Sequence, residues 1–141
     1  MVDRKVLDEY FAGDQLAKAL GMTIKEITPG GAVVTMPLMK IHENGLGNTH
    51  GGAIFSLADF CFAVASNSHG QVAVAANVGI TYLRPPAKGT LTATAREIHR
   101  GRRLGTYDID VTDEKGKTVA VFRGTVAVLE QTIAEALARR E

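Results

Sequence analysis

The chain has 141 residues, 45% hydrophobic and 22% charged, with a formal net charge of +1, which predicts one soluble domain over residues 1–141. The near-neutral charge argues against binding to nucleic acid or to a membrane surface, and no apolar run reaches the roughly 18 residues of a membrane span. The single cysteine, Cys61, excludes an intrachain disulfide, and the start of the chain does not resemble a signal peptide, so we expect a cytoplasmic protein.

The first part of the chain predicts helical structure followed by a strand hairpin. An apolar stripe over about residues 2–20 predicts an N-terminal helix, which Gly13-Asp14 can divide into two short helices. Residues 22–39 alternate on both sides of a Pro-Gly-Gly turn, and this pattern predicts two strands. Pro37 has no N–H to donate to a neighbouring strand, which suggests an edge strand or a bulge.

A long buried helix is expected over about residues 51–68, because apolar residues leave almost no face of it for water. Hairpin-like links between the later strands indicate an antiparallel sheet. The pattern therefore predicts an α+β protein of the hotdog type, with about five to six antiparallel strands wrapped around one central helix. The strands after the helix are expected over residues 72–83, 90–99, 106–112 and 118–129, and a short, frayed surface helix over about residues 130–141.

One carboxylate, Asp59, lies in the middle of the apolar helix. An ionised carboxylate in such surroundings is costly unless it has partners or a chemical role. Asp59 is therefore a candidate catalytic residue. The structural alternative is a buried acid that is hydrogen-bonded to a neighbouring hydroxyl such as Ser56.

Two glycines, Gly51 and Gly52, open the same helix. They let the backbone approach a ligand closely, with unpaired N–H groups at the positive end of the helix dipole, which suits a developing oxyanion. The alternative is that they only permit tight packing of helix and sheet. Asp59 lies about 12 Å beyond Gly51 along the helix, so both can act on one carbonyl only if they come from different subunits of a two-fold dimer.

The loop before the helix supplies further candidates. Asn44 can bind a water or a carbonyl oxygen, or it can simply form a turn. His42 and His50 could be ligands or bases, although His50 is expected to brace the loop by hydrogen bonding. The four histidines lack metal-ligand spacing, so we expect no metal, and Ser56 and Cys61 lack the surroundings of activated nucleophiles.

These residues form one motif, His42-x-Asn44-x-x-Gly47-x-x-His50-Gly51-Gly52 followed by Phe55-x-Leu57-Ala58-Asp59. The motif resembles the signature of hotdog-fold acyl-CoA thioesterases, and in particular of the phenylacetic acid degradation protein PaaI-like group. The likeness covers most of the chain apart from the last dozen residues. It implies that Asp59 is the nucleophile or the general base, that the Gly51 N–H polarises the thioester carbonyl, and that Asn44 orients the water or the carbonyl.

The resemblance also implies the substrate and the assembly. The substrate would be an acyl-CoA, such as (hydroxy)phenylacetyl-CoA or another aryl or medium-chain thioester, with no separate cofactor. Dimers with shared active sites would associate into tetramers as dimers of dimers. Residues that would contact the substrate or the coenzyme A phosphates are His50, Gly52, Arg84, Lys88, Arg102 and Arg103.

Some alternatives stay open at this point. A hotdog hydratase acting on enoyl thioesters is disfavoured because no histidine lies near Asp59 on the helix. An acyl-CoA-binding module without turnover is disfavoured because Asp59, Asn44 and Gly51 occur together. For the acyl group, Phe60, Phe62 and Tyr82 could line an aromatic pocket or pack in the core.

Overall fold

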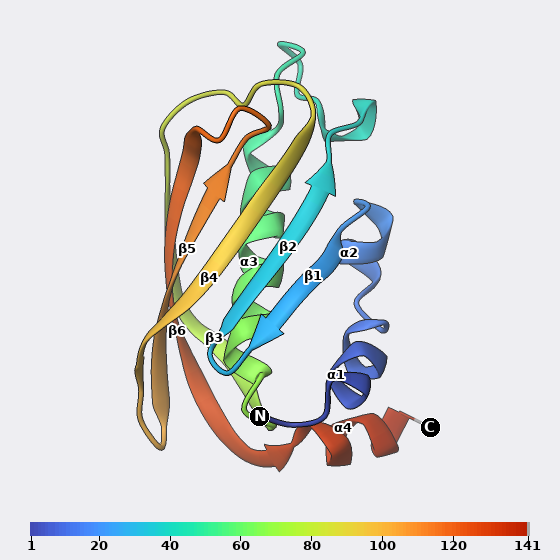
Figure 1. The fold of residues 1–141 in the computed structure, drawn as a ribbon, viewed down its shortest axis with the longest axis vertical. Helices are drawn as coiled ribbons and strands as arrows, with labels where there is room; N and C mark the ends of the chain where they lie inside the picture. Colours follow the sequence, from blue (N-terminus) through green and yellow to red (C-terminus); the bar gives the residue numbers. More distant parts are fainter. Residues whose placement is uncertain (141) are drawn as a thin grey trace.

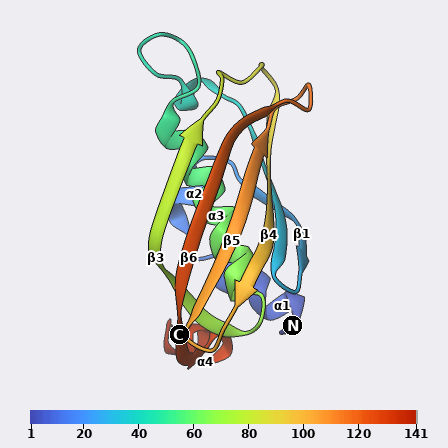
Figure 2. The same ribbon diagram turned by 90° about the vertical axis from the view of Figure 1, so that its left-hand side faces the viewer.

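A six-stranded antiparallel sheet wraps around one long helix, α3 (Gly51–Asn67), in the computed structural model, which describes residues 1–140 (Figure 1). In the view turned by 90°, the sheet is a curved layer with α3 behind it (Figure 2). The α+β hotdog fold expected from the sequence is confirmed. The strands, in the spatial order β1-β2-β4-β5-β6-β3, are β1 (Thr23–Thr28), β2 (Gly31–Pro37), β3 (Gln71–Tyr82), β4 (Thr90–Arg100), β5 (Leu104–Thr112) and β6 (Thr118–Thr132).

Helix α3 lies inside because its apolar residues surround most of its axis. Phe62, for example, packs against Tyr107 of β5 and Phe122 of β6, with ring centroids 5.9 Å and 5.5 Å apart. Burying a side chain of this size contributes about 1.5–3 kcal/mol. The expectation that no face is left for water is nevertheless wrong for one stripe of the helix, where the side chains stay partly exposed: Phe55, Ser56, Asp59 and Ala63.

The N-terminal segment forms two short helices, α1 (Arg4–Phe11) and α2 (Gln15–Ala19), as the Gly13-Asp14 pair allows. Asp14 accepts a hydrogen bond from the Ala17 N–H at 3.0 Å and so caps α2. Both helices lie beside β1 (Figure 1), and Phe11 meets Phe60 of α3 edge to face at 5.7 Å. The segment therefore covers the flank of α3 next to β1.

Strand β3 lies at the far edge of the sheet, beside β6 and not beside β4. The link over residues 83–89 is therefore not hairpin-like, which corrects the connection expected from the sequence. The other edge of β3 is unpaired within residues 1–140. Its sequence, QVAVAANVGITY, contains no charged residue and no proline over 12 residues. Natural edge strands usually carry such residues to prevent pairing with another chain.

The expectation of an edge strand or a bulge at Pro37 is wrong. Strand β2 is paired on both sides, and Pro37 is its last residue, paired with Thr90 of β4. The pairing of β2 with β1 ends at Thr35. The absence of an N–H group at Pro37 therefore leaves no carbonyl group of β1 without its hydrogen-bond donor. The irregularity occurs in β1 instead, between Ile24 and Glu26.

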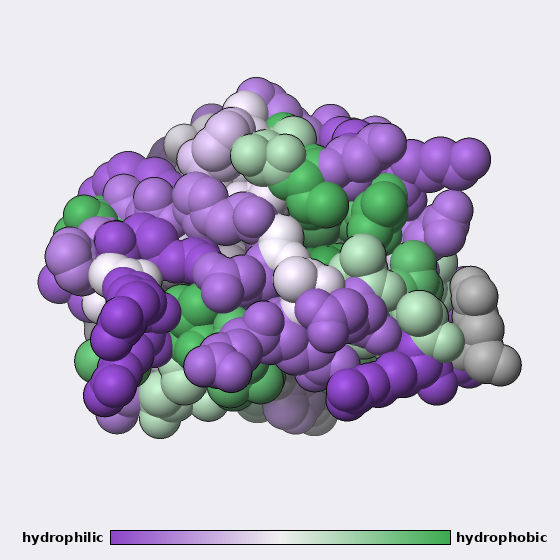
Figure 3. All heavy atoms as spheres, turned by 90° about the horizontal axis from the view of Figure 1, so that it is seen from below, coloured by the Kyte–Doolittle hydropathy of each residue, from purple (hydrophilic) through white to green (hydrophobic). Residues whose placement is uncertain are grey.

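The short helix expected near the end of the chain is present as α4 (Ile133–Arg140), but it starts later than expected because β6 continues to Thr132. The expectation that it is frayed is wrong, because α4 docks on α1. Ile133 is fully buried. The Arg140 guanidinium lies 5.1 Å from the centre of the Tyr10 ring and donates to the carbonyl oxygens of Glu9 and Tyr10. This end of the molecule presents hydrophobic residues between larger hydrophilic areas (Figure 3). The last residue of the predicted tail, Glu141, lies outside the described residues.

Helix length also bears on membrane insertion. Within residues 1–140, none of the helices combines the length and the apolar character that a membrane crossing needs.

Candidate active site

A buried histidine anchors the loop that precedes α3. The Nδ1 atom of His42 accepts from the Met39 N–H at 2.9 Å, and its Nε2 atom lies 2.8 Å from the carbonyl oxygen of Leu20. Since a carbonyl oxygen can only accept, Nε2 carries the proton and the ring is neutral. Both ring nitrogens are therefore occupied within the chain, and His42 is a structural residue and not a base or a ligand.

Asn44 closes the loop through its side-chain oxygen. That oxygen accepts from the Leu46 N–H at 2.9 Å and from the Asn48 N–H at 3.1 Å. The turn role that the sequence left as the alternative is thus present. The side-chain NH₂ group makes no hydrogen bond within residues 1–140, so Asn44 can still donate to a water or to a carbonyl oxygen.

His50 caps α3, and its cap leaves one amide free. Its Nδ1 atom accepts from the Gly52 N–H at 2.8 Å, which confirms the expected bracing role and occupies the Gly52 amide. The Gly51 N–H, at the first position of the helix, has no hydrogen-bond partner in the described part of the chain. Because it lies at the positive end of the helix dipole, it is available to an oxyanion.

The glycine pair also serves tight packing, which was its alternative explanation. A Cβ atom at Gly51 would lie 3.3 Å from the Tyr82 ring, and the Tyr82 hydroxyl donates to the Gly51 carbonyl oxygen at 2.9 Å. Tyr82 is 49% exposed, so it is neither a core residue nor part of an enclosed pocket. Phe62, by contrast, is a core residue, and Phe60 lines a cavity beside Asp59.

Asp59 faces a small cavity of about 200 Å³ between α3 and α2. Its carboxylate makes no hydrogen bond within residues 1–140, and Ser56 donates to the Gly52 carbonyl oxygen instead. The alternative of an acid satisfied by Ser56 is therefore wrong. Burial raises the pKa of Asp59 above its ordinary value, and the negative charge of Asp14 raises it further. Such a carboxylate is a stronger base than an exposed one.

Asp14 was not predicted as part of the site. It lines the Asp59 cavity from the start of α2 while its side chain caps that helix. A helix cap in a segment 45 residues away gives no local signal of a neighbouring carboxylate. Tyr82 was missed as a partner of Gly51 for a similar reason, because only the sheet topology brings the end of β3 to the start of α3.

The basic residues expected to bind phosphates fall into two separate groups. Arg84 and Lys88 lie in the link between β3 and β4, and Lys88 lines a cavity of about 330 Å³ together with Asn48 of the loop. Arg102 and Arg103 lie in the β4–β5 turn at the opposite end of the sheet, beside another cavity of about 790 Å³ (Figure 1). One chain does not bring the two groups together.

The structure also settles the role of Cys61 and describes the potential metal ligands. Cys61 is buried, with its Sγ 3.4 Å from the carbonyl oxygens of Ala32 and Ala93, and burial raises its thiol pKa to about 12. It is a core residue and not a nucleophile, as expected. In the described residues, no three side chains of the metal-ligating types gather in a way that could hold an ion. The absence of a metal from the reaction stays a prediction.

A family model described as "Thioesterase superfamily" matches residues 46–120, which include the helix start and Asp59. The chain belongs to the thioesterase superfamily. Acyl-coenzyme A thioesterase PaaI of Escherichia coli is 49% identical to this thioesterase over 115 residues, which are 81% of this chain and 82% of that protein. The predicted membership of the PaaI-like hotdog thioesterases is confirmed.

Solved structures agree with the fold of this thioesterase. The E. coli PaaI protein from the phenylacetic acid degradation operon superposes with a TM-score of 0.87 at 44% identity, covering 91% of this chain and 94% of that one. A Streptococcus mutans protein, smu.793, solved with acetyl-CoA bound, superposes with a TM-score of 0.75 at 30% identity, covering 79% and 91%. The 49% identity to an acyl-CoA thioesterase and the matching fold identify the chain as a thioester hydrolase, as the sequence predicted.

Proposed function

We propose that the protein hydrolyses acyl-CoA thioesters to a free acid and coenzyme A, with an aryl-acetyl group such as (hydroxy)phenylacetyl, or a medium-chain acyl group, as its substrate class. The observation that carries the proposal is the pair of unsatisfied groups on α3, the Gly51 N–H and the Asp59 carboxylate. One is suited to an oxyanion and the other to an attacking water. Their occurrence in a member of the thioesterase superfamily supports thioester hydrolysis.

In the proposed reaction, the Gly51 N–H donates to the thioester oxygen as negative charge develops on it. The ionised Asp59 either takes a proton from the attacking water or attacks the carbonyl carbon itself, giving an anhydride that water then cleaves. In both routes the C–S bond breaks and coenzyme A leaves as a thiolate. The free NH₂ group of Asn44 orients the water or the carbonyl.

A two-fold dimer is part of this proposal, because Asp59 and Gly51 are separated by about 12 Å along one helix. The uncharged free edge of β3 supports pairing with the β3 strand of a second copy. The partly exposed stripe of α3 would then face the partner and complete two equivalent sites. We further propose that such dimers associate into tetramers.

The same pairing would bring the two groups of basic residues close to each other across the dimer. In an antiparallel β3 pair, the Gln71 end of one strand lies beside the Tyr82 end of the other. Gln71 lines the same cavity as Arg102 and Arg103. These arginines of one chain would therefore approach Arg84 and Lys88 of the other, where phosphates of coenzyme A can bind. His50 and Gly52 lie at the same helix start and would contact the thioester end of the carrier.

The reaction type, the cofactor requirement and the compartment are also part of the proposal. The cavity around Asp59 contains no histidine among its lining residues, which supports hydrolysis over a hydratase reaction. No cofactor is proposed beyond the coenzyme A of the substrate itself. The buried free thiol of Cys61 supports a reducing compartment, and we propose the cytoplasm.

The test is release of free thiol from acetyl-CoA and phenylacetyl-CoA by the purified protein and by Asp59→Asn. The variant keeps the shape of the side chain but cannot take a proton, so kcat should fall by about 10²–10⁴-fold. Turnover near the wild-type rate by Asp59→Asn would refute the assigned role. Binding of both thioesters without any thiol release by the wild type would favour the non-catalytic binding module.

A further inference from the structure

The cavity at Asp59 adjoins a larger one. The first has a volume of about 200 Å³, below the roughly 300–1,000 Å³ that is usual for ligand pockets. The second, which we call the N-terminal cleft, lies between α1–α2 and β1 and has a volume of about 420 Å³. Four residues line both spaces, Asp14, Ala17, Met22 and Phe60. The two cavities therefore lie side by side and share these walls, and we refer to them together as the passage.

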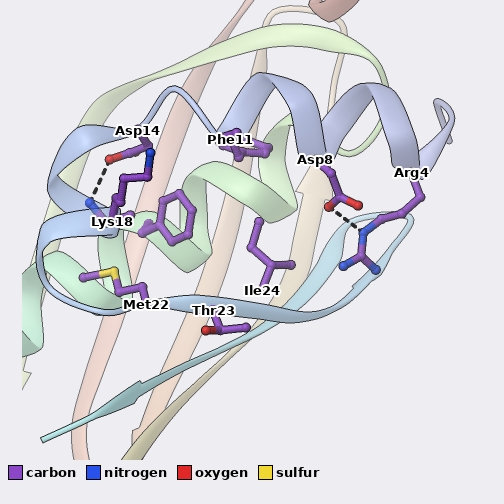
Figure 4. Close-up of a pocket in the computed structure, with 11 residues that line it drawn as sticks. Arg4, Asp8, Phe11, Asp14, Lys18, Met22, Thr23 and Ile24 are labelled. Atoms are coloured by element: carbon purple, nitrogen blue, oxygen red, sulfur yellow. Dashed lines mark hydrogen bonds and ion pairs between the residues drawn. The ribbon is translucent and has the colours of Figure 1, made fainter.

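The walls of the N-terminal cleft are apolar in the middle and charged at both ends, with Asp14 and Lys18 at the end nearer Asp59. Phe11, Met22 and Ile24 point into the space between the helices and β1 (Figure 4). Arg4 and Asp8, which form an ion pair at 2.9 Å, stand at the end away from Asp14 (Figure 4). The passage thus leads from a carboxylate, through aromatic and aliphatic side chains, to a charged rim.

We propose that the N-terminal cleft receives the acyl group of the thioester, so that α1 and α2 form the wall that sets acyl specificity. This inference rests on the proposed role of Asp59, which places the thioester carbonyl at the start of the passage. The coenzyme A arm carries phosphates and stays with the basic surface residues, so the uncharged acyl group extends the other way. There its apolar area leaves water.

The chemistry of the walls defines the acyl group. An aryl ring or a medium-length chain matches Phe11 and Phe60, whose rings already meet edge to face at 5.7 Å. The polar rim at Arg4 and Asp8 tolerates a polar substituent at the far end of the group, such as a ring hydroxyl. Ala17 lines both cavities and so lies at their junction, where its side chain is small.

The decisive variant is Ala17→Leu, which fills the junction without removing any polar group. Leucine is nearly as good a helix former as alanine, so α2 is retained. The kcat/KM ratio of phenylacetyl-CoA to acetyl-CoA should fall by roughly tenfold or more, since the acetyl group ends before the junction. The matched control is Ala19→Leu, on the exposed side of α2 and outside both cavities, which should leave the ratio unchanged.

A second variant guards against a folding defect. Met22→Ala enlarges the passage and should raise kcat/KM for decanoyl-CoA relative to phenylacetyl-CoA. A merely structural effect would lower kcat/KM for all thioesters together and leave both ratios unchanged. If both ratios are unchanged in Ala17→Leu and Met22→Ala, the cleft is not the acyl site. If Ala17→Leu does not fold, the ratio measured for Met22→Ala decides the question by itself. Failure of the proposed function is distinguished separately, by retained acetyl-CoA turnover in Asp59→Asn.

Discussion

At the first turn of α3, the unpartnered amide of Gly51 can be removed with little change to the fold. Proline is tolerated at the first helical position, where its missing N–H has no intrahelical role. His50 already has φ −63° and ψ 133°, a conformation that suits the residue before a proline. We expect Gly51→Pro to lower kcat by about 10²–10³-fold, the usual cost of one oxyanion donor.

The matched control for that prediction is Gly51→Ala. It adds the same Cβ atom 3.3 Å from the Tyr82 ring but keeps the N–H. Steady-state thiol release should therefore separate the two variants, with alanine much closer to the wild type. Equal losses in both would show that crowding against Tyr82, and not the lost donor, controls the rate.

Asp14 provides a second residue-scale prediction, because its charge adds to burial in raising the pKa of Asp59. In the proposed reaction the Asp59 carboxylate acts in its ionised form, so we expect kcat/KM to fall as the pH drops through that raised pKa. Asp14→Asn removes the charge but keeps a good helix cap. The acid limb of the pH profile for acetyl-CoA should therefore move to lower pH.

Asp8→Asn is the control for this shift. Asp8 is paired with Arg4 at the other end of the N-terminal cleft and does not raise the pKa of Asp59. Its pH profile should match the wild type. An acid limb that stays in place in Asp14→Asn would show that burial alone sets the basicity of Asp59.

At the scale of elements, the end of α3 is fastened to β4 and β5 by a polar network. The Glu97 carboxylate accepts from the Tyr107 hydroxyl at 2.7 Å and lies 2.7 Å from His69 Nε2, just after the helix. Burial alone would raise the pKa of Glu97, but hydrogen bonds from Tyr107 and His69, with the charges of His69 and Arg100, hold it below its usual value. Tyr107 is fully buried, and burial and its bond to Glu97 raise its pKa to about 12.

We expect Glu97→Gln to cost about 1–3 kcal/mol of unfolding free energy at neutral pH, since hydrogen bonds to a charged acceptor are weakened. The depressed pKa of Glu97 means that its contribution is present above the ordinary carboxyl pKa and is lost as the pH falls through the folded value. Urea unfolding at several pH values should show the difference between variant and wild type shrinking in acid. A constant difference would contradict this linkage.

How far the sequence predicts these elements depends on how local the signal is. The buried helix with Asp59 in its middle was predictable, because apolar residues surround most of its axis and a glycine pair starts it. The position of β3 was not, since a seven-residue link fits a neighbouring strand as well as a distant one. The docking of α4 was missed for a related reason, because Ile133 and Arg140 find their partners in α1 and not along the tail.

The same limit applies to the site. The cap formed by His50 and the unpartnered amide of Gly51 follow from helix-start chemistry, which a short stretch of sequence contains. The raised pKa of Asp59 depends on Asp14, and the acyl passage depends on Met22 and Phe11, all from segments that only packing brings to α3. Side chains that meet through tertiary packing leave no spacing pattern to read.

At the scale of the whole molecule, the proposed two-fold dimer with shared sites can be tested by mixing two inactive proteins. Asp59→Asn and Gly51→Pro each spoil both sites of their own dimers. In a mixed dimer of the proposed kind, the Asp59 of one chain and the Gly51 of the other would complete one site, while the second site would have both defects. Random exchange of equal amounts should restore about a quarter of wild-type activity, since half of the dimers are mixed and each has one of two sites.

Mixed proteins that regain no activity would contradict the shared site. If native mass spectrometry confirms subunit exchange and no activity returns, both groups must act within one chain. Exchange of Asp59→Asn with wild type serves as the control, because it gives activity in proportion to the wild-type sites that remain.

The position of β3 also orders events while the chain is being synthesised. Its only partner within residues 1–140 is β6, and the paired residues Tyr82 and Ala120 are far apart in sequence. Until β6 has emerged, the 12-residue strand β3, which carries no charge, has no partner on either edge. Such long-range pairing slows folding and leaves strands available for wrong contacts. We therefore expect chains that stop before Thr118 to aggregate more readily than chains that include β6.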